Sequence, residues 1–168
     1  MKGEINVKIS DLISSAIAYD AGDARRIQHF MKVYAFAKAI AEGENADSTT
    51  MEIIEAAAVL HDIGIHECEC KYGSCSGKYQ EKEGVPVAEK ILSELGADSG
   101  FTERVCFLIA HHHTFKGIDS LDWQILVEAD FLVNIYEEGL RREAVESIRR
   151  KVFKTGSGLG LLDNMYLK

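Results

Sequence analysis

Apolar residues recur every three or four positions along most of this chain, which is the spacing of one face of an α-helix. The segment 24–41 shows the pattern most clearly, because its apolar residues fall on a single stripe of a helix. No segment alternates apolar and polar residues as a half-buried strand does. The pattern predicts an all-α helical bundle with these helices: residues 5–19, 24–41, 49–62, 86–95, 101–114, 119–136 and 141–153.

Two segments lack this pattern. Residues 65–84 are rich in polar and small side chains and predict a long loop. Pro86 would then stand in the first turn of the next helix, where its missing N–H does no harm. Residues 155–160 are rich in glycine and predict a flexible tail that closes over a neighbouring site.

Composition indicates a soluble globular protein. The 168 residues fit a single domain over residues 1–168, with 46% hydrophobic and 27% charged residues. The net charge of −8 disfavours binding to long nucleic acids but not to a small anion beside a metal ion. No apolar run approaches the roughly 20 residues needed to span a bilayer, and no signal peptide opens the chain. We therefore expect a cytoplasmic protein without a membrane partner, whose oligomeric state stays open.

Four side chains on three predicted helices suggest a metal site. His61 and Asp62 end the apolar run 56–60, His29 lies on a largely apolar stripe, and Asp130 lies in an apolar helix. A carboxylate in such a helix is costly to bury unless it is paired or bound to a metal. Imidazole and carboxylate ligands suit one divalent transition metal ion, namely Mn, Fe, Co, Ni or Zn. Singly, each residue has a plainer explanation, such as a hydrogen-bonded core histidine or a carboxylate paired with arginine.

These residues resemble the motif of the HD-domain superfamily of metal-dependent phosphohydrolases, which consists of a histidine, a His-Asp pair and a distant aspartate. The resemblance covers a motif-bearing core of about residues 23–136. Four segments carry the resemblance. Residues 26–29 are similar to the family's first helix and residues 57–64 to its hallmark segment. Residues 108–112 are similar to its downstream histidine segment and residues 128–130 to its last ligand segment.

The resemblance implies that His29, His61, Asp62 and Asp130 are the metal ligands, and that the ion binds phosphate and polarises a water. Members with two metal ions usually carry a further histidine where this chain has Gln80. That departure favours a single ion.

Other polar residues are candidates for catalysis or substrate binding. Arg26 lies one helical turn before the first predicted ligand and is a candidate for binding phosphate, although a surface salt bridge explains it equally well. In the downstream histidines, we expect His111 to approach the pocket as a phosphate donor or proton shuttle. His112 is the second choice as a substrate-binding residue, and His113 is expected to be exposed. The alternative is that all three histidines simply end a helix, because a helix C-terminus favours positively charged side chains.

The predicted loop after the His-Asp pair adds two candidates by position alone. Lys71 is a candidate for binding phosphate and Glu81 for a general base, but solvated loop charges are the plainer explanation. The same loop holds one histidine and three cysteines with spacing open to a zinc site, although free thiols are favoured in a reducing compartment. These residues are His66, Cys68, Cys70 and Cys75.

The sequence thus predicts a metal-dependent phosphohydrolase that cleaves a small phosphate ester, such as a nucleotide, with a metal-activated water. The alternative is a catalytically silent HD-like regulatory module that binds a nucleotide or a partner protein.

Overall fold

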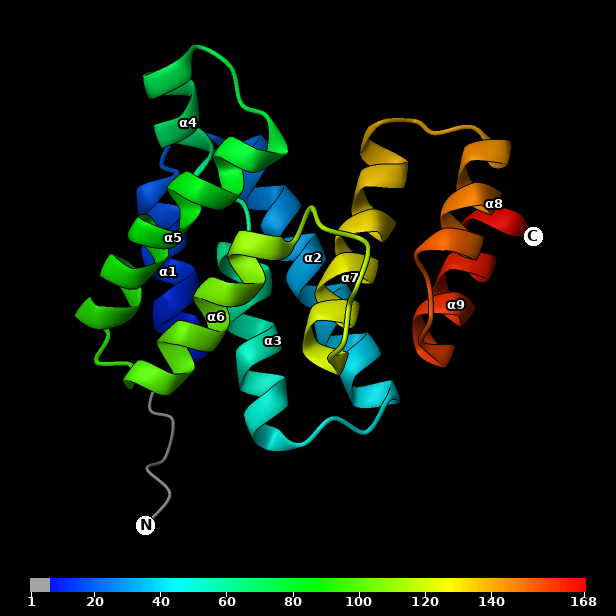
Figure 1. Ribbon diagram of the computed structural model, residues 1–168, viewed down its shortest axis with the longest axis horizontal. Helices are drawn as coiled ribbons and strands as arrows, with labels where there is room; N and C mark the ends of the chain where they lie inside the picture. The colour runs from blue at the N-terminus through cyan, green and yellow to red at the C-terminus, as the bar shows by residue number, and fades with distance from the viewer. Residues whose placement is uncertain (1–6) are drawn as a thin grey trace.

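The computed structural model describes residues 7–168, and over that range it is built of helices and short connections (Figure 1). No strand occurs among the described residues, so the predicted all-α class is confirmed. The elements are α1 (Ile9–Tyr19), α2 (Ala24–Gly43), α3 (Ser48–Leu60), α4 (Ile65–Tyr72), α5 (Gly77–Glu94), α6 (Ser99–His111), α7 (Leu121–Glu137), α8 (Arg142–Lys151), α9 (Gly156–Leu162) and the short π-helix η1 (Asp163–Leu167). Of the first predicted helix, residues 5 and 6 lie outside the described range.

Three helices form the middle of the bundle. In Figure 1, α2, α3 and α7 lie between α1, α4, α5 and α6 on one side and α8 and α9 on the other. The apolar end of α3, residues 56–60, is buried on all sides, as its sequence predicts. Nearly all of α7 is buried as well, including several of its charged residues. Polar side chains of α7 therefore need partners inside the protein.

The predicted loop over residues 65–84 is wrong. The segment forms α4, ends at Gly73 in a left-handed conformation, and enters α5 at Gly77. Pro86 accordingly lies inside α5 on its exposed face, rather than in a first turn. Small residues here serve packing: a Cβ on Gly64 would lie 2.4 Å from the backbone nitrogen of Gly84. Glycine lets these two segments touch, which local pattern alone does not reveal.

The predicted flexible tail at residues 155–160 is also wrong. Thr155 caps α9 by accepting a hydrogen bond from the Gly158 N–H at 2.9 Å. The fully buried carboxylate of Glu128 on α7 accepts hydrogen bonds from the backbone N–H groups of Lys154 and Thr155 and from the Thr155 hydroxyl. A buried acceptor with three donors from this segment fixes it against α7, so the segment is not free to close over a site.

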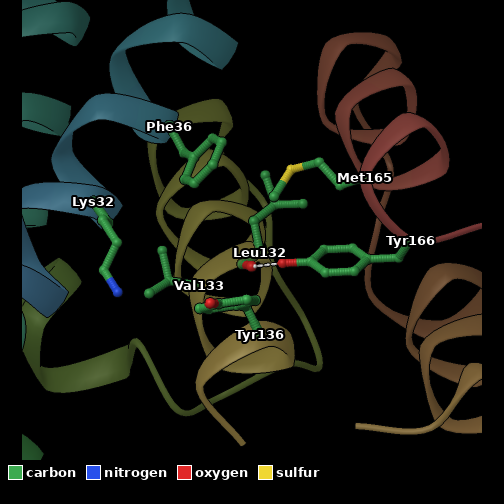
Figure 2. A pocket seen from close by; sticks show the side chains of 7 residues that line it. All are labelled: Lys32, Phe36, Leu132, Val133, Tyr136, Met165 and Tyr166. Carbon is green, nitrogen blue, oxygen red and sulfur yellow. Dashed lines mark hydrogen bonds between the residues drawn. The ribbon is translucent and has the colours of Figure 1, made fainter. Parts of the chain in front are cut away.

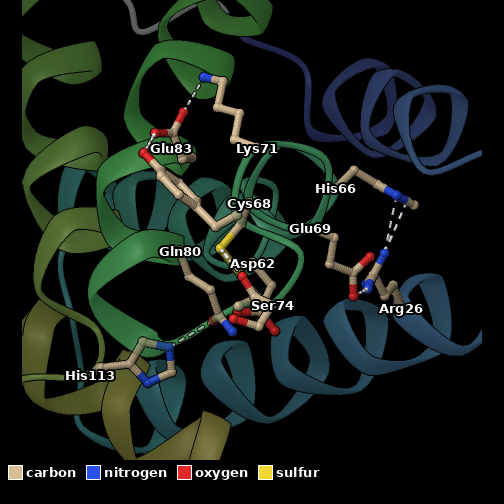
Figure 3. Close-up of a disulfide and its surroundings, with 12 residues drawn as sticks. Arg26, Asp62, His66, Cys68, Glu69, Lys71, Ser74, Gln80, Glu83 and His113 are labelled. Atoms are coloured by element: carbon tan, nitrogen blue, oxygen red, sulfur yellow. Dashed lines mark hydrogen bonds and ion pairs between the residues drawn. A yellow bond between two sulfur atoms is a disulfide. The ribbon is translucent and has the colours of Figure 1, made fainter.

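The cysteines of α4 and the α4–α5 connection differ from expectation. Cys68 and Cys75 form a disulfide (Figure 3), whereas free thiols were favoured from the sequence. Cys70 is free and exposed. His66 faces Arg26, so it does not join the cysteines, and no cysteine belongs to a potential metal cluster among the described residues.

Among the described residues, no helix combines the length and the apolar character needed to cross a bilayer.

The disulfide should contribute to stability through the short loop that it closes. We predict that replacing both Cys68 and Cys75 by serine lowers the free energy of unfolding by about 2 kcal/mol in oxidising buffer. Urea unfolding with and without reductant measures this difference. Cys70→Ser is the matched control and should leave the free energy of unfolding unchanged. A double serine variant as stable as the wild type would contradict the prediction.

Candidate metal centre

The four predicted ligands meet at one point between three helices. His29 comes from α2, Asp130 from α7, and His61 and Asp62 from the turn that follows α3. The Nε2 atom of His29 lies 3.3 Å from Nε2 of His61, 3.2 Å from Oδ1 of Asp130 and 3.4 Å from Oδ2 of Asp62. The Nε2 atom of His61 lies 3.5 Å from the same two carboxylate oxygens. Two imidazole nitrogens and two carboxylates therefore face a common centre.

The other nitrogen of each histidine ring is already used. Nδ1 of His61 lies 2.8 Å from the carbonyl oxygen of Ala58, to which it donates. Nδ1 of His29 lies 2.8 Å from Oε2 of Glu137, and the other oxygen of that carboxylate accepts from Lys32 at 2.6 Å. A ring that donates through Nδ1 presents Nε2 as its ligand atom, and such outer partners orient metal-binding histidines.

The side chains of this cluster shift one another's pKa values. Burial alone would lower the pKa of His29, but the Asp130 hydrogen bond and the Asp62 and Asp130 charges raise that pKa to about 9. The pKa of His61 is likewise raised against the effect of burial, chiefly by Asp62. Burial would raise the pKa of Asp62, but His61 and His112 lower it to about 2. The site therefore holds carboxylates that stay ionised and attract cations.

The structure brings His112, rather than His111, to this centre. His112 is fully buried, its Nδ1 donates to the carbonyl oxygen of Ile109 at 2.7 Å, and its Nε2 lies 3.4 Å from Asp62 Oδ1 without a hydrogen bond. The ring of His111 instead stacks on Phe107, 4.2 Å between ring centroids. Consecutive helical residues point about 100° apart, so only one of the two can face the centre. The expectation that His111 approaches the pocket is therefore wrong.

His113 is half-buried, not exposed as expected. Its Nε2 lies 2.8 Å from Oε1 of Gln80, the residue that stands where two-metal members carry a histidine. Burial and the neighbouring His112 lower the pKa of His113 to about 4, so its ring is neutral. With Asp62, His112 and His113 form a second group of close potential ligands.

The remaining predicted residues lie around this centre without reaching it. Arg26 is held by Asp23 at 3.0 Å and by Glu69 at 2.6 Å, which agrees with the salt-bridge alternative, although it does line the cleft beside the ligands. Lys71 pairs with Glu83 (Figure 3) and does not line the cleft. Glu81 accepts a hydrogen bond from the backbone N–H of His113 at 3.1 Å.

Two cavities flank α7. A cleft of about 500 Å³ opens onto His29 and Asp62, which makes it the access route to the cluster. A separate groove of about 340 Å³ lies between α2, α7 and η1, and its lining is largely apolar (Figure 2). The groove contains none of the predicted site residues.

Two residues of the site were missed from the sequence. Glu137 orients His29, and Asn134 donates to Asp130 Oδ1 at 2.9 Å. A signal was present, because Asp130, Asn134 and Glu137 are spaced by four and three residues in an apolar helix. Such spacing places them on one face, and a polar stripe there indicates a site.

Comparison with known proteins agrees with this geometry. The family model described as the HD domain matches residues 26–147, which is most of the chain. A crystal structure of a predicted HD superfamily hydrolase from an uncultured Thermotogales bacterium superposes with a TM-score of 0.65 at 25% sequence identity. That match covers 95% of this chain and 83% of the other. No curated protein matches the sequence. Fold, motif and family match agree, and the chain therefore belongs to the HD domain family.

Proposed function

We propose that this protein is a metal-dependent phosphohydrolase that cleaves a small phosphate ester. HD domains bind divalent metal ions, and a predicted hydrolase of this superfamily has a similar structure. The observation that carries the proposal is the convergence of two histidine Nε2 atoms and two carboxylates at the base of an open cleft. A structural metal site would be closed on all sides, whereas a catalytic one needs an open position.

The residues present fit one divalent ion. His29, His61, Asp62 and Asp130 would hold it, since both rings offer Nε2 and both carboxylates are ionised. Such an ion supplies Lewis-acid polarisation of a phosphate oxygen and lowers the pKa of water.

Other residues of the chain would bind and orient the substrate. The Nε2 of the buried His112 faces the cluster, 3.4 Å from Asp62 Oδ1, and in the imidazolium form of the ring it would donate a hydrogen bond to a phosphate oxygen. Arg25 lines the cleft and forms no ion pair with another described residue, so its guanidinium is available to a phosphate. Arg26 already has acidic partners, and we assign it to the cleft wall.

The central test is hydrolysis of a panel of phosphomonoesters with added Mn²⁺ or Co²⁺. We predict turnover by the wild type and a loss of at least about 100-fold in kcat/KM for Asp62→Ala, because a lost ligand removes the metal-dependent part of the reaction. Glu143→Ala, an exposed change on α8, serves as the control. Metal content of each protein is measured beside activity.

Two outcomes would contradict this function. Equal activity and metal content in Asp62→Ala and wild type would show that a metal ion bound by Asp62 takes no part in the reaction. Absence of turnover in a metal-loaded wild type, with ligand-induced thermal stabilisation, would favour the regulatory module instead.

Glu137 should tune metal affinity through His29. We predict that Glu137→Ala weakens metal binding about 10- to 100-fold, since partners that orient metal-binding histidines have effects of this size. Glu137→Gln keeps an acceptor oxygen for Nδ1 and should weaken binding less. Glu138→Ala is the neighbouring control, because Glu138 does not contact His29. Competition with a chromogenic chelator gives the affinities, and equal affinities for Glu137→Ala and Glu138→Ala would contradict the prediction.

Metal binding should release protons. With a pKa of about 9, the His29 ring is charged at pH 7 and must lose a proton before Nε2 can bind a metal. Apparent affinity should therefore rise about tenfold per pH unit between pH 7 and pH 8, and level off above pH 9. Calorimetry in two buffers of different ionisation enthalpy counts the released protons. An affinity that stays constant from pH 6 to pH 9 would show that His29 is neutral before the metal binds.

A further inference from the structure

The lining of the cleft indicates the class of substrate. Resting on the proposed hydrolase function, we propose that the substrate is a phosphomonoester of a hydroxylated compound, a sugar or other polyol, and that the site does not recognise a nucleobase. The cleft next to His29 and Asp62 is lined mainly by polar and charged side chains.

Aromatic groups that would stack on a base are missing from the described residues of the cleft, except at His29. Apart from the imidazole of His29, which faces the other three proposed metal ligands, no aromatic ring lines the cleft. Ile65 is the single aliphatic side chain in the lining. An aromatic stacking partner strengthens binding of a base roughly 5- to 150-fold. Without such a partner, a base attached to the phosphorylated sugar gains little from this cleft.

Groups that recognise hydroxyls are present instead. The side-chain amides of Gln80 and Asn134 each use one atom within the protein and keep the other free. Glu138 lines the cleft, is exposed, and makes no hydrogen bond or ion pair with a described side chain. A side-chain amide can donate to a hydroxyl group or accept from it, and an ionised carboxylate accepts from it.

The charge of the cleft also favours a phosphomonoester of a neutral alcohol. Five carboxylates and two guanidinium groups line it, so it is negative before a metal ion binds. A divalent ion offsets part of this charge and attracts one phosphate group beside itself. Further phosphates on the same molecule would face carboxylates rather than cations. A monoester of a neutral alcohol therefore fits better than a nucleoside diphosphate or triphosphate.

The aromatic side chains near α7 lie elsewhere. Phe36, Tyr136 and Tyr166 line the apolar groove of Figure 2, which the Lys32–Glu137 ion pair separates from the cleft. Lys32 lines the groove and Glu137 lines the cleft, so the pair stands between the two cavities. A base attached to a phosphate at the metal ligands would have to break this pair to reach an aromatic ring.

Ribose 5-phosphate and adenosine monophosphate make a matched pair of probes, because they share the phosphorylated ribose and differ by the base. We expect the metal-loaded enzyme to cleave ribose 5-phosphate with a kcat/KM at least equal to that for the nucleotide. Nucleotides with different bases should differ among themselves by less than about threefold. A nucleotide preferred over ribose 5-phosphate by more than tenfold would overturn the proposal.

A variant tests the hydroxyl contacts directly. Glu138→Ala should lower the ratio of kcat/KM for ribose 5-phosphate to that for phenyl phosphate by about fivefold, because phenyl phosphate has no hydroxyl groups. Glu143→Ala, far from the cleft on α8, is the control. An unchanged ratio in Glu138→Ala would count against recognition of the sugar by this residue and so against the proposal.

Failure of the hydrolase function can be told apart from failure of this inference. Turnover of phenyl phosphate without turnover of any sugar phosphate supports a hydrolase and overturns the substrate class. If no ester is cleaved, calorimetric titration of the metal-loaded protein decides the inference alone. Tighter or equal binding of ribose 5-phosphate supports it, whereas tighter binding of the nucleotide by more than tenfold, or binding of neither compound, overturns it.

Discussion

Ionisable side chains buried between helices impose the constraint on which this structure depends. His61 is fully buried, and Asp130 is nearly so, in a bundle whose other buried residues are mainly apolar. An unpaired charge in such a place costs several kcal/mol, so the fold is stable only where imidazoles and carboxylates meet. They meet at 3.2–3.5 Å, which ties α2, the end of α3 and α7 to one another. The candidate metal centre is thus also a determinant of how the central helices pack.

An outer layer of contacts then gives each ring one orientation. Backbone carbonyls hold His61 and His112 through Nδ1, and the Glu137 carboxylate holds His29 in the same way. The three rings consequently present Nε2 toward the carboxylates. Rotation of any ring would leave a buried nitrogen without a partner, which is costly. Orientation of the ligand atoms follows from these contacts and does not need the metal.

Helix α7 serves two sides of the molecule. Asp130 faces the cluster, while Glu128, two residues earlier and therefore about 200° around the helix, faces the C-terminal segment. Glu128 fixes residues 154 and 155 and so positions α9. The apolar groove beyond the Lys32–Glu137 pair is closed on its far side by η1, which the same C-terminal segment supplies. The position of the C-terminal segment thereby bears on the apolar groove beside α7.

The sequence by itself determined the helical class and the four ligand candidates. Period-3.6 patterning reports which face of a helix is buried, and a carboxylate or imidazole on that face is costly enough to indicate a site. Only the tertiary structure decided between His111 and His112, because a shift of 100° around one helix depends on how α6 packs. It also decided that residues 65–72 and 77–84 are helical, and that residues 156–160 belong to α9. The contacts that stabilise these segments join residues far apart in the chain: Gly64 approaches Gly84, and Glu128 forms hydrogen bonds with residues 154 and 155. Local sequence patterns do not predict contacts of this kind.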